Sequence, residues 1–199
     1  MGMIARIDGP APVLARLADL LQLEHDALPA YTLAIHALRD PDRREAARAW
    51  RADHERHAAE LTALIRDLGG IAVPLPHLPT GLFKLAVQAI GAAGGGDRAV
   101  LLAFKANELQ AREKYARMAA SETLPEAAAV LERAAADEAR HYAWAESELE
   151  RLGAGSGTPM GIANNAFAAF HSALADMVEG VGRAGLELML RGMQGTMRR

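Results

Sequence analysis

The chain has 199 residues, a formal net charge of −3 and no cysteine, and 51% of its residues are hydrophobic. That hydrophobic fraction can form a sizeable core and excludes a disordered chain. The near balance of acidic and basic residues argues against a nucleic-acid binder, which needs an excess of positive charge. Without cysteine there are no disulfides, iron–sulfur clusters or thiolate zinc sites, so any bound metal must be held by histidine and carboxylate.

The beginning of the chain shows no targeting pattern, because Asp8 and two prolines precede the first apolar run. No uncharged apolar stretch approaches the roughly 20 residues that a membrane-spanning helix needs. We therefore expect a cytoplasmic protein.

Four segments carry apolar residues at alternating steps of three and four, which is typical of amphipathic helices. No segment alternates with period two for long enough to indicate a strand, so the sequence predicts an all-α fold. Turns at 39–43 and 121–126, which contain Pro41 and Pro125, are expected to join the helices into two antiparallel hairpins. The four helical segments are 14–38, 47–68, 101–118 and 131–152.

A long link at 69–97 separates the two hairpins. Two hairpins joined by one long crossover is the connectivity of a ferritin-like four-helix bundle. The stretch 81–96 within this link is apolar, with Lys84 as its only charge. Three placements remain open for it: against the bundle, between protomers, or on a membrane surface.

The chain repeats itself at a shift of 84 residues. Between 14–70 and 98–154, 13 of 57 positions are identical without a gap, and most of the matched residues are not the abundant alanine. This predicts a duplicated hairpin related by a pseudo-two-fold axis. The polar matches are Glu24 with Glu108, Tyr31 with Tyr115, Asp53 with Asp137, Arg56 with Arg140, and His57 with His141.

Six ionisable residues occupy positions in the helical stripes where a core needs apolar side chains. An unpaired buried carboxylate costs several kcal/mol, so such a group needs a partner. A shared metal ion satisfies all six at once, whereas separate hydrogen bonds are the alternative for each. The candidate ligands are Glu24, His54, His57, Glu108, Glu138 and His141.

This set resembles the dimetal-carboxylate site of the ferritin-like superfamily, in which two helices each give one Glu and two give a Glu-x-x-His. The string from Asp137 to His141 resembles the rubrerythrin-type version of that motif, and the resemblance covers residues 14–153. It implies a centre of one or two iron ions, or manganese, that reacts with dioxygen or peroxide. The implied function is an oxidoreductase or a ferroxidase.

One position departs from the family pattern, because His54 stands where the family has a bridging Glu. An imidazole that binds through one nitrogen does not bridge two ions as a carboxylate does. We therefore expect an unequal site, with either one ion or two ions bridged by Glu138 alone. Asp53 and Glu55 are expected to point away from the stripe.

The sequence also predicts a bundle domain at 1–155 and a helical extension at 156–199. The extension contains several glycines and is expected to depend on a partner surface, in its own chain or in a second protomer, so a homodimer is favoured. Segments 80–96 and 162–197 are the candidates for peripheral membrane contact. Two other functions stay open: a membrane-associated diiron hydroxylase resembling demethoxyubiquinone hydroxylase, and a non-enzymatic structural or stress-related bundle with a degenerate metal site.

Overall fold

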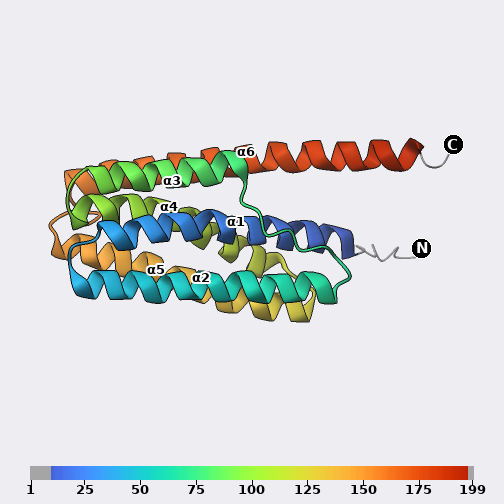
Figure 1. Ribbon diagram of the computed structural model, residues 1–199, viewed down its shortest axis with the longest axis horizontal. Coiled ribbons are helices and arrows are strands. Elements are labelled where there is room, and N and C mark those ends of the chain that lie inside the picture. Colours follow the sequence, from blue (N-terminus) through green and yellow to red (C-terminus); the bar gives the residue numbers. More distant parts are fainter. Residues whose placement is uncertain (1–9, 197–199) are drawn as a thin grey trace, which may run out of the picture.

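The computed structural model describes residues 10–196, with the side chains of 13–77 and 80–177, and folds them into six helices (Figure 1). The described residues contain no strand, which confirms the predicted all-α fold. Within the same range, no helix is long and apolar enough to cross a membrane. The helices are α1 (Pro10–Ala37), α2 (Pro41–Asp67), α3 (Leu78–Ala93), α4 (Asp97–Ser121), α5 (Pro125–Arg151) and α6 (Pro159–Thr196).

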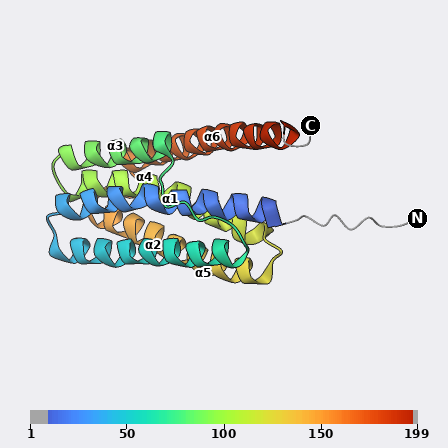
Figure 2. The same ribbon diagram turned by 45° about the vertical axis from the view of Figure 1, so that its right-hand side comes forward.

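The six helices form three layers. Helices α1 and α4 lie in the middle, α2 and α5 cover one side of them, and α3 and α6 cover the other (Figures 1 and 2). The middle pair is therefore covered on two sides, which buries the polar residues of α1 and α4 that point towards either outer layer, such as Glu24 and Glu108.

The duplication extends through a third helix in each half. Helix α3 packs against α1, and α6 packs in the same way against α4. A shift of 84 residues places 78–93 over 162–177, which lies within α6. The predicted link at 69–97 does connect the two hairpins, but its second half is a helix that the sequence analysis did not predict. Of the three placements left open for 81–96, this helix adopts the one against the bundle, because it packs on α1 and α4.

The two hairpin turns are shorter than predicted. Pro41 and Pro125 do not lie in the turns but in the first turn of α2 and of α5. Proline suits this position because its missing N–H would have no partner there and its fixed φ is already helical. At the start of α2, the Asp40 carboxylate also accepts hydrogen bonds from the backbone N–H groups of Asp42 and Arg43.

Helices α2 and α5 end with the same motif. Gly69 and Gly153 have φ values of +78° and +70°, which are accessible at little cost only to glycine. Their N–H groups, and those of the following residues, donate to carbonyls three to five positions back, as in a Schellman motif. The repeated Leu-Gly of the sequence is therefore a repeated helix stop.

Two buried apolar clusters fill the bundle. Between them lies a layer of buried polar residues, which we call the polar belt and which consists of Glu24, His54, His57, Glu108, Glu138 and His141. Tyr115 belongs to one cluster and Tyr31 to the other. The first cluster includes Leu17, Leu21, Leu61, Ile65 and Leu131, and the second includes Leu38, Leu101, Phe104, Ala145 and Leu149.

Polar contacts attach α3 and α6 to the bundle. Before α3, the ring nitrogens of His77 lie 3.0 Å from Asp26 Oδ2 and 3.1 Å from Asp19 Oδ1, both on α1. Before and within α6, Ser156 Oγ and Asn165 Oδ1 accept hydrogen bonds from the buried Lys105 ammonium of α4, at 3.0 and 2.8 Å. The His77 contacts hold the start of α3 against α1, and the Lys105 contacts hold the start of α6 against α4.

Candidate metal centre

The structure brings all six predicted ligands together in the polar belt. None of them has more than 3% of its surface exposed. Each of the four bundle helices contributes, because the residues lie on the inward stripe at the same height along the bundle. Glu24 comes from α1, His54 and His57 from α2, Glu108 from α4, and Glu138 and His141 from α5.

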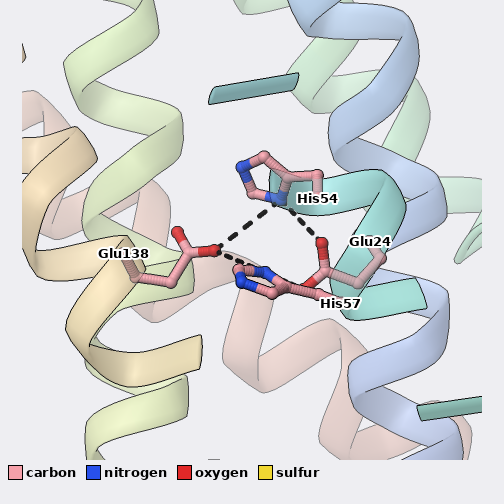
Figure 3. Close-up of side chains that lie close together, drawn as sticks. All are labelled: Glu24, His54, His57 and Glu138. Atoms are coloured by element: carbon pink, nitrogen blue, oxygen red, sulfur yellow. Dashed lines mark hydrogen bonds and ion pairs between the residues drawn. The ribbon is translucent and has the colours of Figure 1, made fainter. Parts of the chain in front are cut away.

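The six residues form two overlapping groups of four. In each group, one nitrogen or oxygen from every residue lies within 4.8 Å of the others. Both groups include His54 and Glu138, so the two groups are adjacent and share these two residues. The first group, drawn in Figure 3, is Glu24, His54, His57 and Glu138, and the second is His54, Glu108, Glu138 and His141.

Glu138 faces both groups with different oxygens. Its Oε1 lies 3.4 Å from His57 Nδ1, and its Oε2 lies 3.7 Å from His141 Nδ1. A carboxylate whose two oxygens face different groups has the arrangement that bridging two ions requires.

The two ring nitrogens of His54 face different groups. Its Nδ1 lies 2.6 Å from Glu24 Oε2, which is hydrogen-bond distance (Figure 3). Its Nε2 lies 4.0 Å from Glu108 Oε2 and has no hydrogen-bond partner in the described structure. With Nδ1 donating to Glu24, the free Nε2 belongs with Glu108 and His141.

Six buried ligand atoms in the belt have no hydrogen-bond partner among the described residues. Buried polar atoms are almost always paired, because an unpaired one costs about 1–3 kcal/mol. These six all face the same interior and come from residues of the two groups, so the donor set fits a metal ion. The atoms are His54 Nε2, His57 Nδ1, Glu108 Oε2, Glu138 Oε1 and Oε2, and His141 Nδ1.

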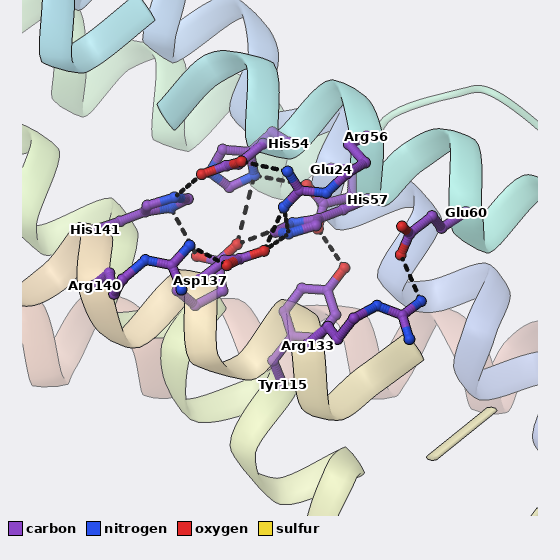
Figure 4. Close-up of polar contacts among 12 residues, drawn as sticks. Glu24, His54, Arg56, His57, Glu60, Tyr115, Arg133, Asp137, Arg140 and His141 are labelled. Atoms are coloured by element: carbon purple, nitrogen blue, oxygen red, sulfur yellow. Dashed lines mark hydrogen bonds and ion pairs between the residues drawn. The ribbon is translucent and has the colours of Figure 1, made fainter. Parts of the chain in front are cut away.

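Outside the belt, each outer histidine is held by an aspartate from the other hairpin. His57 Nε2 lies 3.0 Å from Asp137 Oδ2 of α5, and His141 Nε2 lies 3.1 Å from Asp53 Oδ2 of α2. Arg56 bonds both aspartates (Figure 4). A carboxylate on one ring nitrogen directs the other nitrogen at the metal and strengthens it as a ligand.

The sequence reasoning missed this role of Asp53 and Asp137. Asp53 was expected to point away from the stripe, and nothing was predicted for Asp137, but both side chains reach a histidine of the facing helix. The signal was present in the repeat, where the two aspartates match. Glu55, by contrast, is exposed and pairs with Arg51 at 2.6 Å, so it lies away from the site as expected.

The two repeated tyrosines approach the carboxylates from the apolar clusters. The Tyr115 hydroxyl donates a hydrogen bond to Glu24 Oε1. Tyr31 packs 4.6 Å from the His54 ring, and its hydroxyl has no hydrogen-bond partner in the described part of the chain. Burial, together with the nearby carboxylates, raises the pKa of both phenols well above the usual value, so both stay protonated.

Opposite charges dominate the protonation of the belt. Burial disfavours the charged forms, but the carboxylates Glu138 and Glu24 raise the pKa of His57 to about 11. In the same way, Glu108 and Glu138 raise the pKa of His141 to about 10. Burial also opposes ionisation of Glu138, yet the charge of His54 and the bonds to the other histidines hold its pKa below the usual value. Without metal, protons on the histidines therefore balance the carboxylates.

No protein-family model, curated protein or solved structure matches this chain. Its function must be argued from the site itself.

Proposed function

We propose that this chain is a ferritin-like metalloprotein that holds one or two iron ions, or manganese, in the polar belt and reacts with a small oxidant. The observation that carries the proposal is a set of six ligand atoms that face one buried interior and have no hydrogen-bond partner among the described residues. Hydrogen bonds alone leave these atoms unsatisfied, whereas one or two cations satisfy all of them.

The donor set favours iron or manganese over zinc. Three carboxylates and three imidazoles in two adjacent groups suit ions that accept five or six ligands, while zinc prefers closed four-coordinate sites. When the imidazoles are neutral, the three carboxylates give the site three negative charges. One divalent ion balances two of these charges, and two divalent ions exceed them by one. While the imidazoles are neutral, a buried site with this charge needs bound cations to balance it.

The protein's own residues would prepare the site in three ways. Glu138 would join the two groups, because its oxygens face different histidines. Asp137 and Asp53 would fix the rings of His57 and His141 with Nδ1 inward. The flanking apolar clusters would limit the access of bulk water.

A pair of ferrous ions bound there would supply two electrons, which reduce hydrogen peroxide, with two protons, to two waters. Because the chain has no cysteine, it has no thiolate iron site of its own to return electrons. Repeated turnover would therefore need an external electron donor.

A second proposal concerns assembly. The outer layer exposes several large apolar side chains, which are Leu82 and Ile90 on α3 and Phe170 and Met177 on α6. Exposed apolar patches mark contact surfaces. We propose that this layer contacts a second copy of the chain, and a membrane-associated hydroxylase would instead place it on lipid.

The experiment is anaerobic loading with ferrous iron, followed by mixing with peroxide or with dissolved oxygen. We expect iron to be retained and ferric absorbance to appear. Glu138→Gln should lose most of the bound iron, whereas Glu55→Gln, next to His54 in the chain but exposed, should behave as wild type. Iron that binds but stays ferrous with both oxidants would favour the non-enzymatic alternative, and a protein that binds no iron would contradict the proposal.

A further inference from the structure

A small cavity lies beside the belt, between α1, α3 and α4. Its polar lining residues are Tyr31, Lys84, Gln88, Asn107 and Glu108, and three alanines and Phe104 complete the wall. Glu108 also belongs to the second group of candidate ligands, so the cavity adjoins that half of the centre. None of the five polar residues has more than 7% of its surface exposed.

Two amide oxygens in this wall are unpaired acceptors. The Gln88 amide donates to the Val100 carbonyl at 3.2 Å, and the Asn107 amide donates to the Lys84 carbonyl at 3.3 Å. These bonds fix which end of each side chain is nitrogen. Gln88 Oε1 and Asn107 Oδ1 are left buried without a partner among the described residues, and the Tyr31 hydroxyl is equally unpaired.

Such a wall selects its occupant by hydrogen bonding. Two carbonyl oxygens require a molecule with two donors, and the Tyr31 hydroxyl can donate to that molecule's lone pair. Water and hydrogen peroxide both have two O–H donors and lone pairs, whereas dioxygen has no donor. The cavity offers about 10 Å³ for the centre of a water-sized molecule, which is room for one water or for two bonded oxygens but not for an organic substrate.

We propose that this cavity is a binding subsite for hydrogen peroxide, occupied by a water when peroxide is absent. Gln88 and Asn107 accept its two hydrogens, and the Glu108 side of the subsite opens towards the proposed metal centre. The role of the subsite rests on the proposed function, because binding there matters only if the centre consumes peroxide. It also gives α3 a function, since Gln88 and Lys84 both lie on that helix.

The first test needs no metal. A crystal structure of the metal-free protein should show one water within hydrogen-bond distance of Gln88 Oε1 and Asn107 Oδ1. After a peroxide soak, that density should lengthen to two atoms. The double variant Gln88→Leu/Asn107→Leu should show an empty cavity in both conditions. A dry cavity in the wild type, or a water that peroxide does not replace, would overturn the proposal.

The second test uses the iron-loaded protein. In stopped-flow mixing, the double variant should need at least about tenfold more peroxide for half-maximal ferrous oxidation, because two hydrogen bonds are lost. Its rate with dioxygen should not change. Gln110→Leu is the matched control, because it removes a buried amide of α4 that lies outside the cavity. An equal effect of the control on peroxide use would overturn the proposal.

The two tests separate the subsite from the proposed function. If soaked crystals hold peroxide as described but ferrous iron is neither bound nor oxidised, the metal proposal fails and the subsite remains. If iron is oxidised but the soaked cavity and the double variant's peroxide dependence are unchanged, the subsite fails alone.

Discussion

Metal binding by this protein should release protons and strengthen steeply with pH. The metal-free protein keeps His57 and His141 protonated at neutral pH, since their pKa values are about 11 and about 10. A metal ligand must be a neutral imidazole, so each ion that uses one of these histidines displaces its proton. Below pH 9, affinity should rise about tenfold per pH unit for an ion bound by one of them and about 100-fold for binding that uses both.

Proton competition acts in both halves, because the pKa values of His57 and His141 both lie well above neutrality. The halves differ in their other ligands. The His141 half has His54 Nε2, which has no hydrogen-bond partner in the described structure. We therefore expect the first ion to bind there.

The assay is calorimetric titration with manganese(II), which is stable to air during the measurement, at several pH values and in buffers of different ionisation enthalpy. The buffer dependence counts the protons released. For the first ion we expect one from His141 and a second from His54, because Glu138 and Glu24 raise the pKa of His54 despite its burial. The variant His36→Gln serves as the control, because His36 is exposed and remote from the belt. Affinity that stays constant across the pH range, with no proton released, would refute the assignment of these histidines as ligands.

The remaining predictions concern three parts of the molecule. His54→Glu should raise the occupancy towards two ions per chain, and His54→Ala should lower it or leave a single ion; equal, tight binding of two ions by the wild type would contradict this. Asp137→Asn and Asp53→Asn should each weaken metal binding about 10- to 100-fold in the half whose histidine they hold, while unchanged titrations would show that these aspartates only stabilise the fold. Truncation at Gly155 removes α6 and uncovers apolar surface of α4, so light scattering should report aggregation or a changed oligomeric state; a soluble product of the original assembly would count against it.

The helices and candidate ligands could be predicted because they produce local signals. A carboxylate such as Glu24 within an apolar stripe is conspicuous, since a core otherwise excludes charge. The repeat then placed Glu108 and His141 in the same register as Glu24 and His57. Both signals need only the helical period and one shift of the chain.

The contacts between the aspartates and the outer histidines could not be predicted from the pattern of a single helix. Asp53 and Asp137 lie off the stripe, and each meets a histidine of the opposite hairpin, so their role depends on how the hairpins pack. Helix α3 was also missed, whereas α6 lies within the predicted helical extension at 156–199. The segment that forms α3 is short, and it lies between a proline-rich stretch and a run of glycines, which are typical of a link. Its packing on α1 and α4 is a tertiary feature that the local pattern does not show.

The central claim is that the polar belt holds a metal ion, and anomalous diffraction from crystals grown with manganese tests it most directly. We predict a strong anomalous peak bounded by Glu108, Glu138 and His141 in the wild type, with a weaker second peak towards Glu24. In Glu138→Ala, both peaks should disappear or fall sharply. Crystals of the wild type with no anomalous peak inside the bundle would contradict the account.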